Sequence, residues 1–185
     1  NDIRLSRNQV NKSIKICIMR KYYEMLCYLF DIGIRFTEDN LNYAILLENS
    51  EVSTKIVNFI LSKKIQYNKT SIINAITVNN LERLKHILKT NIDNKLEISI
   101  TSRLLTLALK LNHIDISDFL IEKGLTITTR GFDYMIKNRS INYCKQIIKN
   151  VKISNRSMDY AIKRHNNLSF LKLLKKNGGN FTSIG

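Results

Sequence analysis

Six basic side chains recur at almost regular intervals in the second half of the chain. The three lysines are 27 and 26 residues apart, and each has an arginine seven residues before it. In the last two sets a tyrosine lies between the two basic residues. Guanidinium and ammonium groups bind carboxylates and phosphates, and tyrosine adds the flat amphipathic contact that is typical of interfaces. We therefore predict a surface for an acidic partner that comprises Arg103, Lys110, Arg130, Tyr134, Lys137, Arg156, Tyr160 and Lys163.

The charge of the whole chain has two interpretations. There are 30 Lys+Arg against 15 Asp+Glu in 185 residues, a formal net charge of +15. Residues 137–176 hold eleven basic residues and one acid, Asp159, whereas residues 1–92 hold 14 basic and eight acidic residues. A local net charge of +10 is large enough for an electrostatic footprint on nucleic acid. Duplication of a lysine-rich unit in an AT-rich genome would give the same periodic basic residues. The alternative interpretation is therefore a solvated basic face without a specific role.

Patterns typical of catalysis or metal binding are scarce. The six glycines form neither a GxGxxG segment nor a Walker-type phosphate loop. Cys17 is expected in the core, and Cys27 and Cys144 have no histidine partner that would activate a thiol. We expect the few acidic residues of the C-terminal half to be unpaired. No histidine has a second ligand at metal spacing, so we predict no enzyme, no metal and no cofactor. The histidines are His86, His113 and His165.

Composition restricts the class of protein. Hydrophobic residues make up 44% of the chain and charged residues 24%, which is ordinary for a folded protein. Proline is absent, which favours a chain built of helices because proline breaks helix interiors. Three scattered cysteines form no disulfide framework, and no apolar run approaches the ~20 residues of a membrane span. We therefore expect a helical protein that does not enter membranes.

The elements that position the basic residues follow from an internal repeat. Segments 101–110, 128–137 and 154–163 align without gaps, and segments 37–46 and 68–77 share their pattern. Each has a small residue or Met at one reference position, an apolar residue three positions before it and another directly after it. This pattern is one face of a helix. With a weaker first copy, the reference positions are Cys17, Ala44, Ala75, Ala108, Met135 and Ala161, spaced by 27, 31, 33, 27 and 26 residues.

Each copy predicts a pair of helices. Five copies carry a helix-capping side chain seven residues before the reference position: Thr37, Asn68, Thr101, Thr128 and Ser154. Turns rich in Asn and His follow at 49–50, 79–80, 112–113, 138–139 and 165–167. Apolar pairs then mark a second helix, and glycines 33, 124 and 178 close three of these helices. No pair buries its apolar face alone, so neighbouring pairs must stack.

One segment of the chain carries a family resemblance. The stretch ALKLNHIDISDFLIEKG at 108–124 closely resembles the ankyrin repeat, and segments 31–33 and 177–181 are similar to its ending. The resemblance covers nearly the whole chain and is nearest to the degenerate, Ile-, Asn- and Lys-rich ankyrin proteins of giant DNA viruses. It implies an all-α solenoid whose first helices line a concave face. It also implies that His113 makes structural hydrogen bonds.

The chain departs from typical ankyrin repeats in two ways. The Thr-Pro-Leu-His box is absent, and several spacings are shorter than the usual ~33 residues, so β-hairpin fingers should be short or absent except at 91–100. A tetratricopeptide array is the competing fold, but its period and its Trp, Gly and Pro landmarks are missing. We predict a single array over 1–185, with units at approximately 4–36, 37–67, 68–100, 101–127, 128–153 and 154–181. The ends, 1–4 and 178–185, resemble parts of adjoining units, which predicts a segment of a longer protein.

The resemblance implies a non-enzymatic adaptor or scaffold that binds a protein partner through its basic concave face. For a viral member of the family, this partner would be a host factor. Nucleic-acid binding through 137–176 is the alternative, although no helix-turn-helix, RNP or zinc-finger pattern is present. A structural component of a larger particle is a third hypothesis. We expect a location in the cytoplasm (that of the host for a viral protein), with the nucleus as the alternative, and no membrane association. The sequence makes no prediction of the oligomeric state.

Overall fold

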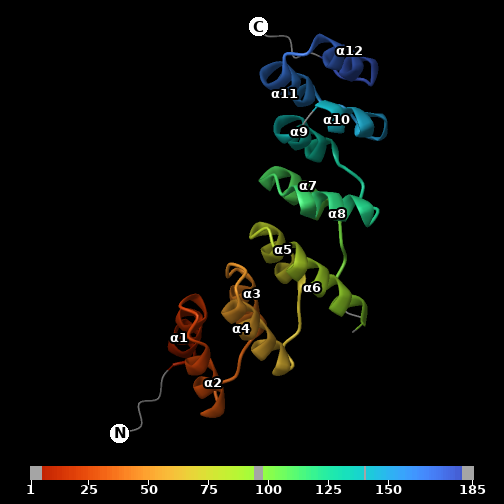
Figure 1. Cartoon of the computed structure of the whole chain (residues 1–185). Helices are drawn as coiled ribbons and strands as arrows, with labels where there is room; N and C mark the ends of the chain where they lie inside the picture. The colour runs from red at the N-terminus through yellow and green to blue at the C-terminus, as the bar shows by residue number, and fades with distance from the viewer. Residues whose placement is uncertain (1–5, 94–97, 140, 181–185) are drawn as a thin grey trace. The chain divides into compact units, whose positions relative to one another are not determined.

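Helices form all the regular secondary structure in the part of the chain that the computed structural model describes (Figure 1). The structure describes residues 6–93, 98–139 and 141–180. The chain divides into two compact units, residues 1–99 and 100–185. The all-α prediction is thus confirmed. The predicted finger at 91–100 and the predicted continuations at both ends fall partly outside the described residues.

The described residues of the first unit form three helix pairs. Within each pair the helices pack on one another, and consecutive first helices pack side by side, α1 with α3 and α3 with α5. Among the second helices, α2 also packs on α4. The helices are α1 (Arg7–Met19), α2 (Tyr23–Asp31), α3 (Glu38–Ile45), α4 (Glu51–Ser62), α5 (Lys69–Thr77) and α6 (Leu81–Asp93).

The second unit repeats the arrangement. Its first helices, α7, α9 and α11, form a row in which α9 packs between the other two, and each packs on its own second helix. The last turn of the second pair narrows to a 3-10 helix, η1. The elements are α7 (Ser102–Leu111), α8 (Ile114–Glu122), α9 (Thr129–Asn138), α10 (Ile141–Ile147), η1 (Ile148–Asn150), α11 (Asn155–His165) and α12 (Leu168–Lys176).

The predicted helix starts are confirmed in all five copies. Thr37, Asn68, Thr101, Thr128 and Ser154 are the N-caps of the first helices. The side chains of Asn68, Thr128 and Ser154 accept hydrogen bonds from backbone N–H groups three residues later, at 3.2, 3.0 and 3.1 Å. Each such bond satisfies a donor that the helix itself leaves free and contributes about 1 kcal/mol.

The predicted turns are confirmed in part. Asn79, Asn112 and Asn166 adopt the left-handed conformation in which asparagine ends a helix. Asn49 and Asn138 do not adopt it: the φ of neither residue is positive. Lys64 stands where other copies have glycine after the second helix, and it takes φ 65°. Lysine has no preference for the left-handed conformation, so residue type does not account for the turn there.

The apolar triplets around the reference positions form the core. Leu41, Ala44 and Ile45 of α3 are completely buried, and the equivalent residues of α1, α5, α7 and α9 are also buried. The exception is Ile162 of α11, which follows the last reference position and is 41% exposed. The core thus consists of one apolar stripe for each first helix, covered by its own second helix and by neighbouring pairs.

Polar side chains set the register between consecutive first helices. In α3 and α9 the residue two before the reference position bonds to the N-cap region of the next first helix. Asp133 of α9 accepts hydrogen bonds from the Ser154 and Ser157 hydroxyls of α11. In the other unit Asn42 accepts from the Ser71 hydroxyl at 2.8 Å. Since these groups are buried or partly buried, the bonds resist sliding of α5 along α3 and of α11 along α9.

A second set of bonds joins consecutive pairs at the other end of the first helices. In α3, α7 and α9 the backbone carbonyl directly after the reference position lies within hydrogen-bond distance of a side chain of the following pair. Arg83 donates to Ile45 O at 2.8 Å, Asn138 to Leu109 O at 3.1 Å, and His165 Nε2 lies 2.8 Å from Ile136 O. These carbonyls lie at or near helix C-termini, where the helix supplies fewer of its own donors.

Removal of the Asp133 carboxylate should destabilise the second unit. In Asp133→Ala the Ser154 and Ser157 hydroxyls lose a buried acceptor, so we expect a loss of about 2 kcal/mol. Asp133→Asn keeps one acceptor oxygen, as Asn42 does in the first unit, and should lose less. Urea unfolding followed by circular dichroism measures both variants. A Asp133→Ala protein as stable as the wild type would show that this bond does not hold α9 to α11.

Candidate partner-binding surface

The eight predicted binding residues lie in the second unit, on the row of first helices. On α9 the sequence positions of Arg130, Tyr134 and Lys137 follow an i, i+4, i+7 pattern, and Arg156, Tyr160 and Lys163 repeat it on α11. Residues with this spacing lie on one face of a helix, about 10 Å from end to end. On α7 the pattern is Arg103, Leu107 and Lys110. We call these three helical faces the basic stripes.

The cations of the basic stripes are exposed and lack acidic partners. All six are exposed, whereas Tyr134 and Tyr160 are half-buried. No described residue forms an ion pair with any of the six. The Arg130 guanidinium lies over the Tyr134 ring, 5.9 Å from its centroid. The stripes are therefore open to an external anionic group.

The two kinds of cation stand at opposite ends of the helix dipole. Lys110, Lys137 and Lys163 lie in the last turns of their helices, where a cation faces the negative end and is stabilised by about 0.3–1 kcal/mol. The three arginines are each the second residue of a helix, where a cation faces the positive end and is disfavoured. Helix stability therefore accounts for the lysines and leaves the arginines unexplained.

The basic segment 137–176 is spread over two sides of the repeats. Lys163 lies two positions after Ala161 on α11, which is about 200° round the helix from this buried core residue. The second helix α12, with Lys172, packs on α11 through its buried residues Phe170 and Leu174. The lysines of α10, η1 and α12 therefore do not belong to the basic stripes.

The cysteines and histidines have mainly structural surroundings. Cys17 is buried as predicted, and burial raises the pKa of its thiol. Burial also raises the pKa of Cys144 to about 11. His113 differs from the expectation: it caps α8 through its backbone, and its buried Nε2 has no hydrogen-bond partner in the part of the chain described.

The prediction that the acidic residues of the C-terminal half are unpaired is wrong. Asp118 lies 3.5 Å from the nearly buried Arg139 guanidinium and accepts a hydrogen bond from Tyr143. Arg139 also donates to the Ser117 hydroxyl at 2.7 Å. Burial and the Asp118 carboxylate together raise the pKa of Tyr143 to about 12. The side chains come from three elements, so spacing along the chain gave no sign of this cluster.

The chain matches no protein-family model, and no curated protein or solved structure is significantly similar to it. Across residues 6–93, 98–139 and 141–180, no three His, Cys, Asp or Glu side chains come together as a metal site. None of the helices described is long and apolar enough to cross a membrane.

The burial of the thiols predicts an order of reactivity. At pH 8 a thiol whose pKa is raised has a smaller thiolate fraction, and the thiolate is the reactive form. Cys144 and Cys17 should therefore react with a disulfide reagent only when the protein unfolds, whereas the half-buried Cys27 should react first. Mass spectrometry of peptides labelled in native conditions and in denaturant measures the order. Labelling of native Cys144 as fast as Cys27 would contradict it.

Proposed function

We propose that this chain is a non-enzymatic protein-interaction module, an ankyrin-like solenoid of helix pairs that binds an acidic protein partner through its basic stripes. The observation that carries the proposal is the row of exposed cations on three neighbouring helices, α7, α9 and α11, that form no ion pair with any described residue. A repeat array offers an extended surface, and a basic one attracts acidic partners and speeds their association. For a viral member of this family type the partner is a host factor.

The ankyrin-like assignment is supported by local features of the helix pairs. Each pair has a capped first helix, a tight turn and a second helix, and Gly33, Gly124 and Gly178 close second helices with positive φ. The links between the pairs at 32–37, 63–68 and 123–128 are short and contain no strand. This agrees with ankyrin-like units that lack β-hairpin fingers.

The arginines of the basic stripes favour binding over a solvated face without a role. Lysines at helix C-termini stabilise their helices, so they need no partner to explain them. Arginines at the second helical position give no such benefit. A guanidinium also presents a planar fork of donors that matches a carboxylate. The stripes therefore contain three groups suited to an acidic partner and poorly suited to helix stability.

The proposal predicts that charge reversal of the arginines abolishes binding without loss of stability. The triple variant Arg103→Glu, Arg130→Glu, Arg156→Glu places carboxylates at helix N-termini, where they are favourable, so its melting temperature should equal or exceed that of the wild type. Its affinity for a fluorescent poly-glutamate peptide, measured by anisotropy at physiological salt, should fall at least tenfold.

A matched control separates the basic stripes from the net charge. The variant Lys145→Glu, Lys149→Glu, Lys172→Glu makes the same change in charge on exposed residues of α10, η1 and α12. It should bind the peptide nearly as well as the wild type. Equal losses in the two triple variants would mean that only the overall charge attracts the peptide, and would refute the role of the stripes.

Nucleic-acid binding is the second candidate, and the net charge of +10 over 137–176 favours it. A random single-stranded oligonucleotide tests it in the same assay. Several phosphate contacts would make the affinity fall steeply as salt rises, and both triple variants would weaken it, because a polyanion can follow both sides of the repeats. Stronger binding to the oligonucleotide than to the peptide at physiological salt would replace the first proposal with this one.

A further inference from the structure

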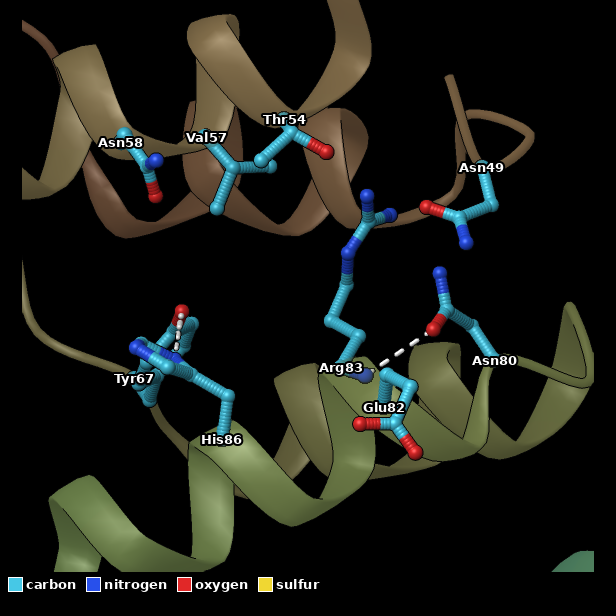
Figure 2. A pocket seen from close by; sticks show the side chains of 9 residues that line it. All are labelled: Asn49, Thr54, Val57, Asn58, Tyr67, Asn80, Glu82, Arg83 and His86. Carbon is cyan, nitrogen blue, oxygen red and sulfur yellow. Dashed lines mark hydrogen bonds between the residues drawn. The ribbon is translucent and has the colours of Figure 1, made fainter. Parts of the chain in front are cut away.

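A cavity of about 270 Å³ lies in the first unit, whereas the basic stripes belong to the second. It is lined by α4 and the turn before it, by the start of α6 and by Tyr67. Figure 2 shows the Arg83 side chain standing across it, with the Asn49 and Asn80 amides on one side and the Tyr67–His86 pair on the other. Most of the residues that line it carry a group that can donate a hydrogen bond, and the exceptions are Val57 and the carboxylate of Glu82.

Arg83 brings a positive charge into this cavity, and no described side chain acts as its counter-ion. The residue is 8% exposed, and burial lowers the pKa of its guanidinium. No described carboxylate forms an ion pair with it, and the nearby Glu82 is paired with Lys85 at 2.9 Å. A buried charge without a partner is costly, so this arrangement favours an anion beside the guanidinium.

The hydrogen bonds of Arg83 leave one edge of the guanidinium available. Its Nη1 donates to Ile45 O at 2.8 Å and to Leu47 O at 3.3 Å. In the described part of the chain, Nε and Nη2 have no acceptor. The Nε–Nη2 edge is one of the two forks through which arginine binds an oxyanion with two parallel hydrogen bonds.

The bonds to the backbone do not by themselves require a guanidinium. In the second unit an amide, Asn138, and an imidazole, His165, supply the donor for the carbonyl that is equivalent to Ile45 O. Arg83 therefore performs the shared structural task with two of its five N–H groups and adds a charge that the task does not need.

The groups around Arg83 suit an oxyanion as well. The Asn80 Oδ1 already accepts from the Arg83 backbone N–H at 2.9 Å, so its Nδ2 is left to donate. The Tyr67 hydroxyl lies 3.1 Å from His86 Nδ1, and burial raises the pKa of Tyr67 to about 12, so the phenol stays neutral. No negative charge is thus introduced by the tyrosine.

We propose that the cavity between α4 and α6 is a binding site for an oxyanion, a carboxylate or phosphate group, held by the free edge of Arg83 and by the amides of Asn49 and Asn80. The site is separate from the basic stripes, because all the residues that line it belong to the first unit and the stripes belong to the second. Its volume accommodates a small anion or a single acidic group of a larger ligand.

Nuclear magnetic resonance titration of the whole chain tests the site. Sodium phosphate and sodium acetate are the probes, each compared with sodium chloride at equal ionic strength and pH. We expect saturable shifts of the Arg83 Nε–H and of the backbone amides of 49–58 and 80–86. Saturation by phosphate alone identifies a phosphate site, saturation by acetate alone a carboxylate site, and saturation by both a general oxyanion site.

Two variants and one control complete the test. Asn49→Asp places a carboxylate in the cavity and keeps Arg83, so it should weaken anion binding at least tenfold and should raise the melting temperature by pairing the guanidinium. Arg83→Gln keeps an amide donor for Ile45 O and should also lose anion binding. Asn142→Asp makes the same charge change on exposed α10 and should bind as the wild type does.

Three results would overturn the proposal. The first is the absence of saturable shifts around Arg83 with both anions. The second is wild-type affinity in Asn49→Asp, and the third is a set of shifts spread over the lysine-rich surface that all variants share. The last two would indicate diffuse attraction to a basic protein.

Discussion

The fold depends on the burial of the apolar residues around the reference position of each first helix, with Ile162 of α11 as the exposed exception. A pair of short helices cannot cover these residues alone, and α3 or α5, with eight and nine residues, would be marginal as an isolated helix. Packing on the neighbouring pair removes them from water, and full burial of one large apolar side chain contributes about 1.5–3 kcal/mol. Apolar contact has little directional preference, however, so it does not decide how far one helix slides along the next. The polar bonds at the two ends of the first helices set this register, as the bond between Asp133 and Ser157 does for α9 and α11.

The sequence predicted the parts of the fold that local chemistry determines. Ser154 caps a helix because its hydroxyl reaches a backbone N–H three residues later, and Asn112 ends one because asparagine tolerates the left-handed conformation. Lys64 adopts the same conformation without such a preference, so its turn depends on contacts that only the folded chain supplies. The bonds of Asp133 were not predictable for the same reason: they join residues 21 and 24 positions apart, and require the register of two helices.

The candidate sites also differ in whether local sequence or contacts between distant residues determine them. Helical periodicity was sufficient to group Arg130, Tyr134 and Lys137 on one face, because all three belong to one helix. Arg83 gave no signal in the sequence, since an arginine beside Glu82 on an amphipathic helix is ordinarily solvated. It is buried because it reaches back to the carbonyls of Ile45 and Leu47 in the preceding pair. Arg139 is buried in a comparable way against Asp118 and Ser117 of the pair before it.

These buried arginines differ from the exposed ones in what satisfies their charge. Arg139 has the carboxylate of Asp118 within 3.5 Å, and Arg83 has backbone carbonyls and an open edge. The cations of the basic stripes have water, which solvates them at little cost, so each can exchange solvent for a partner without disturbing the core. The core and its register are maintained by Asp133, Asn42 and the capping residues, none of which belongs to the stripes. A stripe residue can therefore be changed without loss of the stack, and this independence of surface and scaffold is what a repeat protein needs if similar units are to bind different partners.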